Sequence, residues 1–374
     1  MKILIAGDFC PQHRVARSFE SGDFATVLGE VKPILESADY SIVNFECAVT
    51  SGVEKPIEKI GPNLQCSKRG MEAVKWSGFD CVTLANNHFY DFGNDGVEKT
   101  LEACKEYGID IVGGGMNLQE ASRILYKEIA GQTLAIINCC EHEFSIATDN
   151  SGGSNPLNPI QQFYDIRKAR ESADYVLVIV HGGHEMYQLP SPRMQETYRF
   201  FVDAGADAVV NHHQHCFSGY EMYNGKPIFY GLGNFCFDNS VYRNAIWNEG
   251  YLVMIEFGHS QSFQLIPYMQ CGDTVSISFL NEDDVFIKKV HELNSIILSP
   301  AKLKDSFNEG IQQRFGLYFR VLKPYPFNRY FAKLDSYGIL PSFVSKKKML
   351  RFVNYVFCES HLDGFRQMLK QSDK

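Results

Sequence analysis

Short runs of apolar residues alternate with amphipathic stretches from the N-terminus to about residue 235. The apolar runs predict strands, and the stretches with apolar residues at helical spacing predict helices. The predicted strands of this region are residues 2–6, 40–44, 81–84, 109–112, 134–138, 175–180, 208–210 and 227–230. The predicted helices are residues 24–37, 67–77, 97–107, 159–172 and 194–204. This alternation of strands and helices predicts an α/β fold.

Three further patterns refine this prediction. The Asn224-Gly225 pair is typical of a tight hairpin turn. Residues 251–257 and 263–268 predict two antiparallel strands. Residues 152–159 are rich in Gly, Asn and Pro, and they predict a loop on the side of the active site.

The composition changes near residue 300. Residues 301–374 hold 14 Lys and Arg against 6 Asp and Glu, and the net charge of the whole chain is −8, so residues 1–300 carry −16. We therefore expect one α/β domain at 1–299 and a basic, aromatic-rich helical extension at 300–374. An acidic body argues against a nucleic-acid-binding protein, because binding the phosphate backbone needs a basic surface.

The cysteines and the N-terminus indicate a compartment. The 11 cysteines are odd in number and include no Cys-x-x-Cys pair, which favours a reducing environment over a disulfide framework. The first apolar run, residues 3–6, is much too short for a signal sequence. No later run approaches the roughly 18 apolar residues of a membrane span. We therefore expect a cytoplasmic protein.

Residues with metal-binding side chains stand at or just after the predicted strand ends. They are Asp8, Glu46, Asn87, His181, His213 and His215. Ligands in α/β folds collect beyond the carboxyl ends of the strands, so we expect these side chains to converge. Their nitrogen and oxygen donors suit one or two divalent ions of Mn, Fe or Zn. Each residue alone has another explanation, since such residues also cap turns or lie on solvated loops.

Several short motifs follow one another in a specific order. They are Gly7-Asp8, Asn44-Phe45-Glu46, Asn86-Asn87-His88 with Asp91, His181-Gly182-Gly183-His184-Glu185, Gly205-Ala206-Asp207, His212-His213-Gln214-His215 and Gly231-Leu232-Gly233-Asn234-Phe235. Over about residues 1–257 the chain thereby resembles the poly-gamma-glutamate capsule-synthesis (CapA) family. The resemblance implies a fold similar to the calcineurin-like metallophosphoesterases, a four-layer α-β-β-α sandwich of two mixed sheets between helical layers.

The resemblance also implies a role for each residue of the motifs. The implied ligands are Asp8 and His215 for a first ion, Asn87, His181 and His213 for a second ion, and Glu46 as the bridge between them. His88 resembles the histidine that faces the leaving-group oxygen, and Asp91 would hold its ring. Asn44, Glu185 and Asn234 would support the ligands or contact the substrate. Each could instead form hydrogen bonds only within its own turn or loop.

Three departures from the metallophosphoesterase pattern leave the number of ions open, and one of them is Asn211 in place of the glycine usual before the paired histidines. The first strand usually ends in Asp-x-His, but here it reads Asp8-Phe9-Cys10. Cys10 either binds a thiophilic metal or is a small buried side chain, and burial is the favoured interpretation. Glu46 replaces an Asp and is longer by one methylene, which changes the spacing of a bridged pair. Both a one-metal and a two-metal site therefore stay open.

The chain fits two classes of function. The first is a metal-dependent hydrolase that cleaves a phosphoester or related linkage in a small molecule or polymer, with His88 as the general acid. The resemblance implies a role in capsule or surface-polymer synthesis. The second is a non-catalytic accessory protein that binds metal or polymer. A fold does not decide between them.

The extension also allows two interpretations. Its crowded aromatic residues are Phe315, Tyr318, Phe319, Tyr325, Phe327, Tyr330 and Phe331. Basic residues lie between them, so they could form a surface for an anionic membrane or a protein partner. The favoured interpretation is a helical cap on the acidic body, because the aromatic side chains would otherwise leave a large apolar patch in water.

Overall fold

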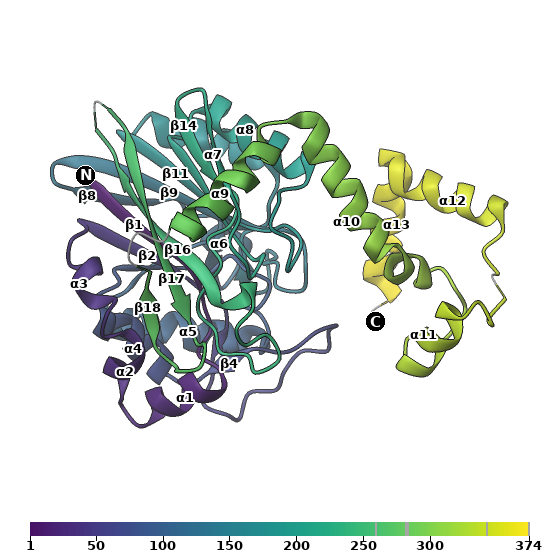
Figure 1. Ribbon diagram of the computed structural model, residues 1–374, viewed down its shortest axis with the longest axis horizontal. Coiled ribbons are helices and arrows are strands. Elements are labelled where there is room, and N and C mark those ends of the chain that lie inside the picture. Colours follow the sequence, from purple (N-terminus) through teal and green to yellow (C-terminus); the bar gives the residue numbers. More distant parts are fainter. Residues whose placement is uncertain (259, 281–283, 342, 373–374) are drawn as a thin grey trace. The chain divides into compact units, whose positions relative to one another are not determined.

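The computed structural model (Figure 1) describes residues 1–258, 260–280, 284–341 and 343–372. The chain divides into two compact units, Met1–Asp305 and Ser306–Lys374. All residues predicted to act in the site belong to the first unit.

The larger sheet of the first unit is mixed. Its strands are β1 (Lys2–Phe9), β2 (Tyr40–Phe45), β5 (Cys81–Thr83), β6 (Asp110–Val112), β15 (Asn234–Cys236), β16 (Glu249–Glu256), β17 (Ser262–Gln270) and β18 (Ile277–Phe279). Their order is β18-β17-β16-β1-β2-β5-β6, and β15 pairs with β1 outside this path. Strands β1, β2, β5 and β6 are parallel, whereas β16, β17 and β18 join the sheet antiparallel.

The second sheet is also mixed. Its strands are β8 (Leu125–Ile129), β9 (Gln132–Cys140), β11 (Tyr175–His181), β12 (Ala208–His212), β13 (Tyr220–Tyr223) and β14 (Lys226–Phe229). Their order is β13-β14-β12-β11-β9-β8. The four central strands are parallel. The outer strand β13 turns back on β14 through the predicted Asn224-Gly225 hairpin.

The two sheets pack face to face between helices, which confirms the predicted four-layer sandwich. Ile3 and Ile5 of β1 and Leu177 and Ile179 of β11 belong to one buried cluster between the sheets. The helices on the outer faces are α1 (His13–Glu20), α2 (Phe24–Leu28), α3 (Lys32–Leu35), α4 (Arg69–Ser77), α5 (Gly93–Tyr107), α7 (Pro159–Arg170) and α8 (Pro192–Ala204). The first five bury side chains with the larger sheet, and the last two with the second sheet.

Several predicted elements differ from the structure. The single helix predicted at 24–37 is wrong, because two short helices, α2 and α3, occupy this region. Pro33 has no amide hydrogen to donate to the carbonyl of Gly29, so one continuous helix is disfavoured. The loop predicted at 152–159 contains a short strand, β10 (Gly153–Ser154), which pairs with β7 (Gly114–Gly115). Helix α1 and strand β8 were not predicted.

The remaining elements of the first unit are short, apart from one helix. They are β3 (Ala48–Val49), β4 (Gln65–Cys66), α6 (Leu118–Ala121), the 3-10 helix η1 (Ile246–Asn248) and the longer α9 (Asp284–Ile297). Strands β3 and β4 pair in parallel, and residues 50–64 connect them.

The C-terminal extension is helical, as predicted. Its helices are α10 (Pro300–Arg320), α11 (Arg329–Ser336), α12 (Lys346–Phe357) and α13 (Glu359–Ser372). Neither α11 nor α12 fully buries a side chain. The side chains of Phe315 and Phe319 lie outside the described residues, and docking of the aromatic residues on the first unit stays a prediction. Among the described helices, none has the length and apolar character needed to span a membrane.

Candidate metal centre

The predicted ligands gather at one edge of the two sheets. The larger sheet supplies Asp8 at the end of β1, Glu46 directly after β2 and Asn87 after β5, and the second sheet supplies His181 at the end of β11 and His213 and His215 after β12. All six side chains are buried. The carboxyl ends of parallel strands thus bring oxygen donors from one sheet and nitrogen donors from the other to a single place.

The carboxylate of Asp8 is held from both sides. Its Oδ1 accepts a hydrogen bond from Asn44 Nδ2 at 2.7 Å, and its Oδ2 accepts one from the backbone N–H of His213 at 3.2 Å. The preceding residue must be Gly7, because a Cβ there would lie 1.9 Å from the carbonyl oxygen of Gly233. This close approach places β15 beside the end of β1.

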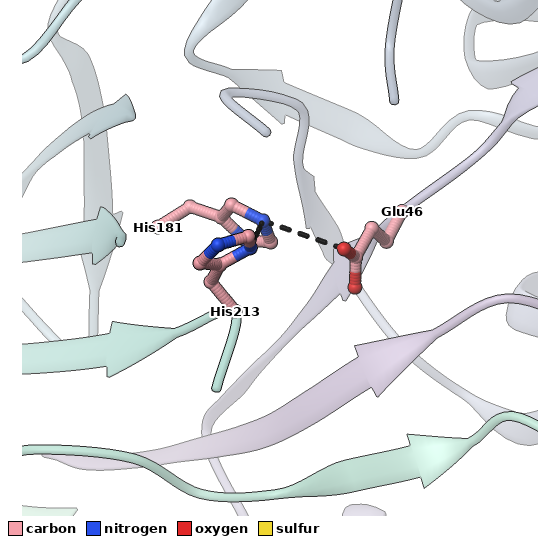
Figure 2. Close-up of side chains that lie close together, drawn as sticks. All are labelled: Glu46, His181 and His213. Atoms are coloured by element: carbon pink, nitrogen blue, oxygen red, sulfur yellow. Dashed lines mark hydrogen bonds and ion pairs between the residues drawn. The ribbon is translucent and has the colours of Figure 1, made fainter. Parts of the chain in front are cut away.

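The carboxylate of Glu46 lies between the histidines. Its side chain is fully buried, and neither carboxylate oxygen accepts a hydrogen bond from a residue that the structure describes. Its Oε1 lies 3.4 Å from His181 Nε2 and 3.7 Å from His215 Nε2. Figure 2 shows this oxygen directed toward His181, next to the ring of His213. An enclosed carboxylate of this kind is costly unless a cation compensates it.

The ring nitrogen Nε2 of His181 lies close to two other atoms that could bind a metal ion. Its Nε2 lies 3.0 Å from Asn87 Oδ1 and 3.0 Å from His213 Nδ1. Two nitrogens bound to one ion at about 2.1 Å, and at a right angle, would be about 3.0 Å apart. The spacing of the two imidazoles is therefore that of neighbouring ligands in one coordination sphere.

Among the residues that the structure describes, three overlapping sets of side chains could each hold an ion. The sets are Glu46 with His181 and His213, Asp8 with Glu46 and His215, and the exposed Glu185 with His213 and His215. Within each set the ligand atoms lie within 4.8 Å of one another. Glu46 belongs to two of the sets, which is the arrangement expected of a bridging carboxylate.

The two histidines after β12 have unusual backbone angles. The φ of His213 is 91° and the φ of His215 is 54°, in the left-handed region that costs a non-glycine residue about 1–3 kcal/mol. Asn234 helps to hold this turn: its Oδ1 lies 2.9 Å from His215 Nδ1, and its Nδ2 donates to the carbonyl of His215. The ring of Trp247 covers His215 at 4.8 Å between centroids. The contact at Nδ1 leaves His215 Nε2 facing Glu46.

His88 and Asp91 form a separate contact beside the ligands. The Nδ1 of His88 lies 2.7 Å from Asp91 Oδ2. Both side chains are buried, as is that of Lys59, whose ammonium pairs with Asp91 and lies 3.2 Å from His88 Nδ1. Sequence reasoning did not identify Lys59, because it follows no strand end and belongs to none of the quoted motifs.

Burial and mutual charge set the protonation of the centre. Burial raises the pKa of Asp8, but the hydrogen bond with His215 lowers it to below its ordinary value. Burial, and then the negative charge of Asp8, raise the pKa of Glu46 well above its usual range. Burial lowers the pKa of His181 and that of His213, the latter to about 3. Both imidazoles are therefore neutral and can offer a lone pair to a cation.

Cys10 and His212 lie close to the centre in different ways. Cys10 is fully buried, its Sγ accepts a hydrogen bond from Gln12 Nε2 at 3.3 Å, and burial raises the pKa of its thiol. These contacts favour a buried side chain over a metal ligand. His212 Nδ1 lies 3.6 Å from Asp8 Oδ1, and neither of its ring nitrogens has a hydrogen bond to a described residue.

The donors fit divalent metal ions. Two buried carboxylates, one amide oxygen and three imidazoles are the ligand types that Mn, Fe and Zn share. The oxygens of Glu46, buried without hydrogen bonds from the described residues, are the clearest sign, because a cation between Glu46 and the histidines would compensate them.

Two relatives are similar in sequence to more than half of this chain. Over 220 residues the chain is 37% identical to the capsule biosynthesis protein CapA of Bacillus anthracis, covering 57% of this chain and 54% of that protein. Over 235 residues it is 34% identical to the PGA biosynthesis protein CapA of Bacillus subtilis, covering 62% of each. The match thus spans less than two thirds of either relative.

A likeness to solved structures extends over much of the chain. A 5'-nucleotidase precursor from Thermus thermophilus is 10% identical, with a TM-score of 0.45 over 78% of this chain and 57% of that one.

The model of the family described as bacterial capsule synthesis protein PGA_cap matches residues 2–239. This match confirms the family resemblance of the motifs. Because it covers more than half of the sequence, the chain belongs to the family of bacterial capsule synthesis proteins PGA_cap.

Proposed function

We propose that the protein is a metal-dependent hydrolase that cleaves a phosphoester or a related linkage during the synthesis of a capsule or another surface polymer. The observation that carries this proposal is the fully buried carboxylate of Glu46, which lies among three histidines and Asp8 without a hydrogen bond from a described residue. The names of the two CapA relatives support the biological setting. The substrate class, a small molecule or a polymer, is part of the proposal.

The ligands divide into two groups that share Glu46. Asp8 and His215 would hold one ion, and His181, His213 and Asn87 would hold the other, with Glu46 between the two. When bound, divalent ions supply an activated water and stabilise the negative charge that develops on a phosphoester oxygen. The chain itself orients these ligands: Asn44 holds Asp8, and Asn234 holds His215.

His88 is assigned the transfer of a proton to the leaving group. Asp91 contacts Nδ1, which fixes the ring and leaves Nε2 for the substrate. The pKa of His88 is lowered by burial, although its contact with Asp91 raises it in part. The contact with Asp91 therefore favours the protonated ring, which is the form that can donate to an oxygen leaving group.

Turnover of p-nitrophenyl phosphate and bis(p-nitrophenyl) phosphate tests the proposal. The full chain should be active with added Mn²⁺ and inactive after treatment with EDTA. His181→Ala should lose both bound metal and activity, whereas His291→Ala, a control on the exposed face of α9, should keep both. A protein that binds metal at the centre and cleaves neither ester, nor any member of a wider phosphoester panel, would contradict the hydrolase proposal.

One relative favours a second candidate function. The chain is 26% identical over 226 residues to a probable polyglutamine synthesis accessory protein of Mycobacterium tuberculosis, covering 55% of this chain and 58% of that protein. A non-catalytic accessory protein would keep the metal centre for binding a polymer or a partner. Bound metal together with no turnover, in the assay above, is the result that this alternative predicts.

A further inference from the structure

The connection between β3 and β4 is long and exposed. Residues 51–64, called loop 51–64 from here on, form neither helix nor strand, and Figure 1 shows them as an irregular loop beside β4. Val53 is 82% exposed and Ile60 is 87% exposed. Exposed loops usually have few fixed contacts. Loop 51–64 differs, because Ile57, Lys59 and Leu64 all contact the buried residue Asp91.

Asp91 holds this loop at three points. Its Oδ2 accepts a hydrogen bond from the backbone N–H of Leu64 at 2.6 Å, and its carbonyl oxygen accepts one from Ile57 at 2.9 Å. Its Oδ1 pairs with the ammonium of Lys59. The same residue contacts His88 Nδ1 through Oδ2. Asp91 therefore links loop 51–64 to the proposed proton donor.

Lys59 is the unusual member of this network. Its side chain is 2% exposed, although its neighbours Glu58 and Ile60 are exposed. Enclosing an ammonium group is costly, and pairing with a carboxylate only partly offsets the cost. Asp91 Oδ1 accepts no hydrogen bond of standard geometry from the described residues, so the charge of Lys59 is what compensates this oxygen.

We propose that Lys59 is a positioning residue that locks loop 51–64 onto Asp91 and so fixes the ring of His88 beside the metal centre. Lys59 occupies Oδ1 and leaves Oδ2 of Asp91 for His88. Without the ammonium group, Oδ1 would be a buried charge without compensation, and the carboxylate would turn toward water. The loop and the ring of His88 would then loosen together, because both depend on the same carboxylate.

Limited proteolysis of the full chain tests the lock without any need for turnover. Lys59→Met keeps the length of the side chain and removes the charge, Lys59→Arg keeps the charge, and Lys55→Met alters an exposed lysine of the same loop. Proteinase K should cut Lys59→Met within residues 51–64 about tenfold faster than the wild type, because local opening exposes the backbone. Lys59→Arg and Lys55→Met should be cut at close to the wild-type rate. Cutting of Lys59→Met at the wild-type rate would overturn the lock.

Kinetics test the effect on His88, and this arm rests on the proposed hydrolase function. With saturating Mn²⁺, Lys59→Met should lower kcat by about tenfold or more, with KM and bound Mn²⁺ little changed. Lys59→Arg should recover most of the loss. Adding Lys59→Met to Asp91→Asn should cost little more than Asp91→Asn alone, because the two residues belong to one network.

The outcomes separate the two proposals. A wild-type protein without turnover would defeat the hydrolase function, while the proteolysis result would still decide whether Lys59 fastens the loop. Wild-type kcat in Lys59→Met, or equal losses of bound metal and kcat in both Lys59 variants, would defeat the positioning role.

Discussion

The exchange of Glu46 for Gln should stabilise the metal-free protein and abolish its stabilisation by metal. Glu46 is fully buried, and no described residue donates a hydrogen bond to its carboxylate. Burial and the charge of Asp8 raise its pKa well above the ordinary value, so its ionised form is costly. Gln has nearly the same shape without the charge, and its amide can donate to the nearby nitrogen of His181 or His215.

The expected changes in melting temperature follow from the size of the first unit. At 100 times its Kd, a bound ion stabilises a protein by about 2.7 kcal/mol. For a unit that spans Met1–Asp305, an unfolding entropy of about 2.1 cal/mol/K per residue makes 1 kcal/mol equivalent to about 1.6 °C. The wild type should therefore gain about 4 °C from Mn²⁺. Burying an acid without hydrogen bonds costs about 1–3 kcal/mol. Because Glu46→Gln removes this cost, its Tm in EDTA should be higher than that of the wild type by about 2–5 °C.

The pH dependence provides an independent check of the sign. A carboxyl group whose pKa is raised by folding binds more protons in the folded state, so the free energy of unfolding falls as pH rises above the unfolded value of about 4.3. In EDTA, the Tm of the wild type should therefore fall relative to that of Glu46→Gln as pH rises from about 5 to about 8. The gain from a fixed amount of Mn²⁺ should grow with pH, because protons compete with the ion for Glu46.

Thermal unfolding followed by circular dichroism measures these effects, with Glu36→Gln, at an exposed position, as the control. Glu36→Gln should behave as the wild type in both EDTA and Mn²⁺. If Glu46→Gln kept the full gain from Mn²⁺, Glu46 would not be a ligand. If its Tm in EDTA fell by several degrees, the carboxylate would be stabilising the fold in its own right, and the reasoning from its missing hydrogen bonds would be wrong.

Three further predictions concern other parts of the chain. His88→Ala should keep the Mn²⁺ stoichiometry of the wild type, measured by elemental analysis, while kcat falls by about 10²–10⁴-fold; loss of metal would show that His88 is a ligand. Asn234→Ala should weaken Mn²⁺ binding by about 10–100-fold in calorimetry, because His215 loses its orienting contact; an unchanged affinity would remove that role. If the extension is a cap, the full chain should not sediment with anionic vesicles at low salt; salt-sensitive binding that is lost on exchange of Lys346, Lys347 and Lys348 for Ala would instead favour the membrane surface.

The location of the centre could be predicted because the strands are short and end abruptly. The apolar runs that form β1, β2 and β11 stop within a few residues of Asp8, Glu46 and His181. In a sheet of parallel strands, the ends of neighbouring strands lie together whatever the lengths of the connections. The convergence of these side chains therefore follows from a pattern that is visible in the sequence.

Lys59 could not be predicted in the same way. It lies in loop 51–64, whose path depends on contacts with Asp91 rather than on a local pattern. Its neighbours are exposed, and nothing in the spacing separates it from Lys55, which is also exposed. The choice between ligand and buried thiol at Cys10 also needed the structure, because it depends on which side chains surround the sulfur.

The division of donors between the two sheets links metal binding to the stability of the fold. Asp8, Glu46 and Asn87 come from the larger sheet, whereas the three histidines come from the second sheet. In the metal-free protein, burial lowers the pKa of His215, but the charges of Glu46 and Asp8 raise it to about 10. The neutral imidazoles of His181 and His213 differ, because they give Glu46 little attraction across this edge. A bound ion would replace these weak contacts by bonds to both sheets, so the binding free energy would stabilise their packing. The stabilisation expected from Mn²⁺ should therefore appear as slower hydrogen exchange at the ends of β1 and β11, whereas the outer strand β18 should change little.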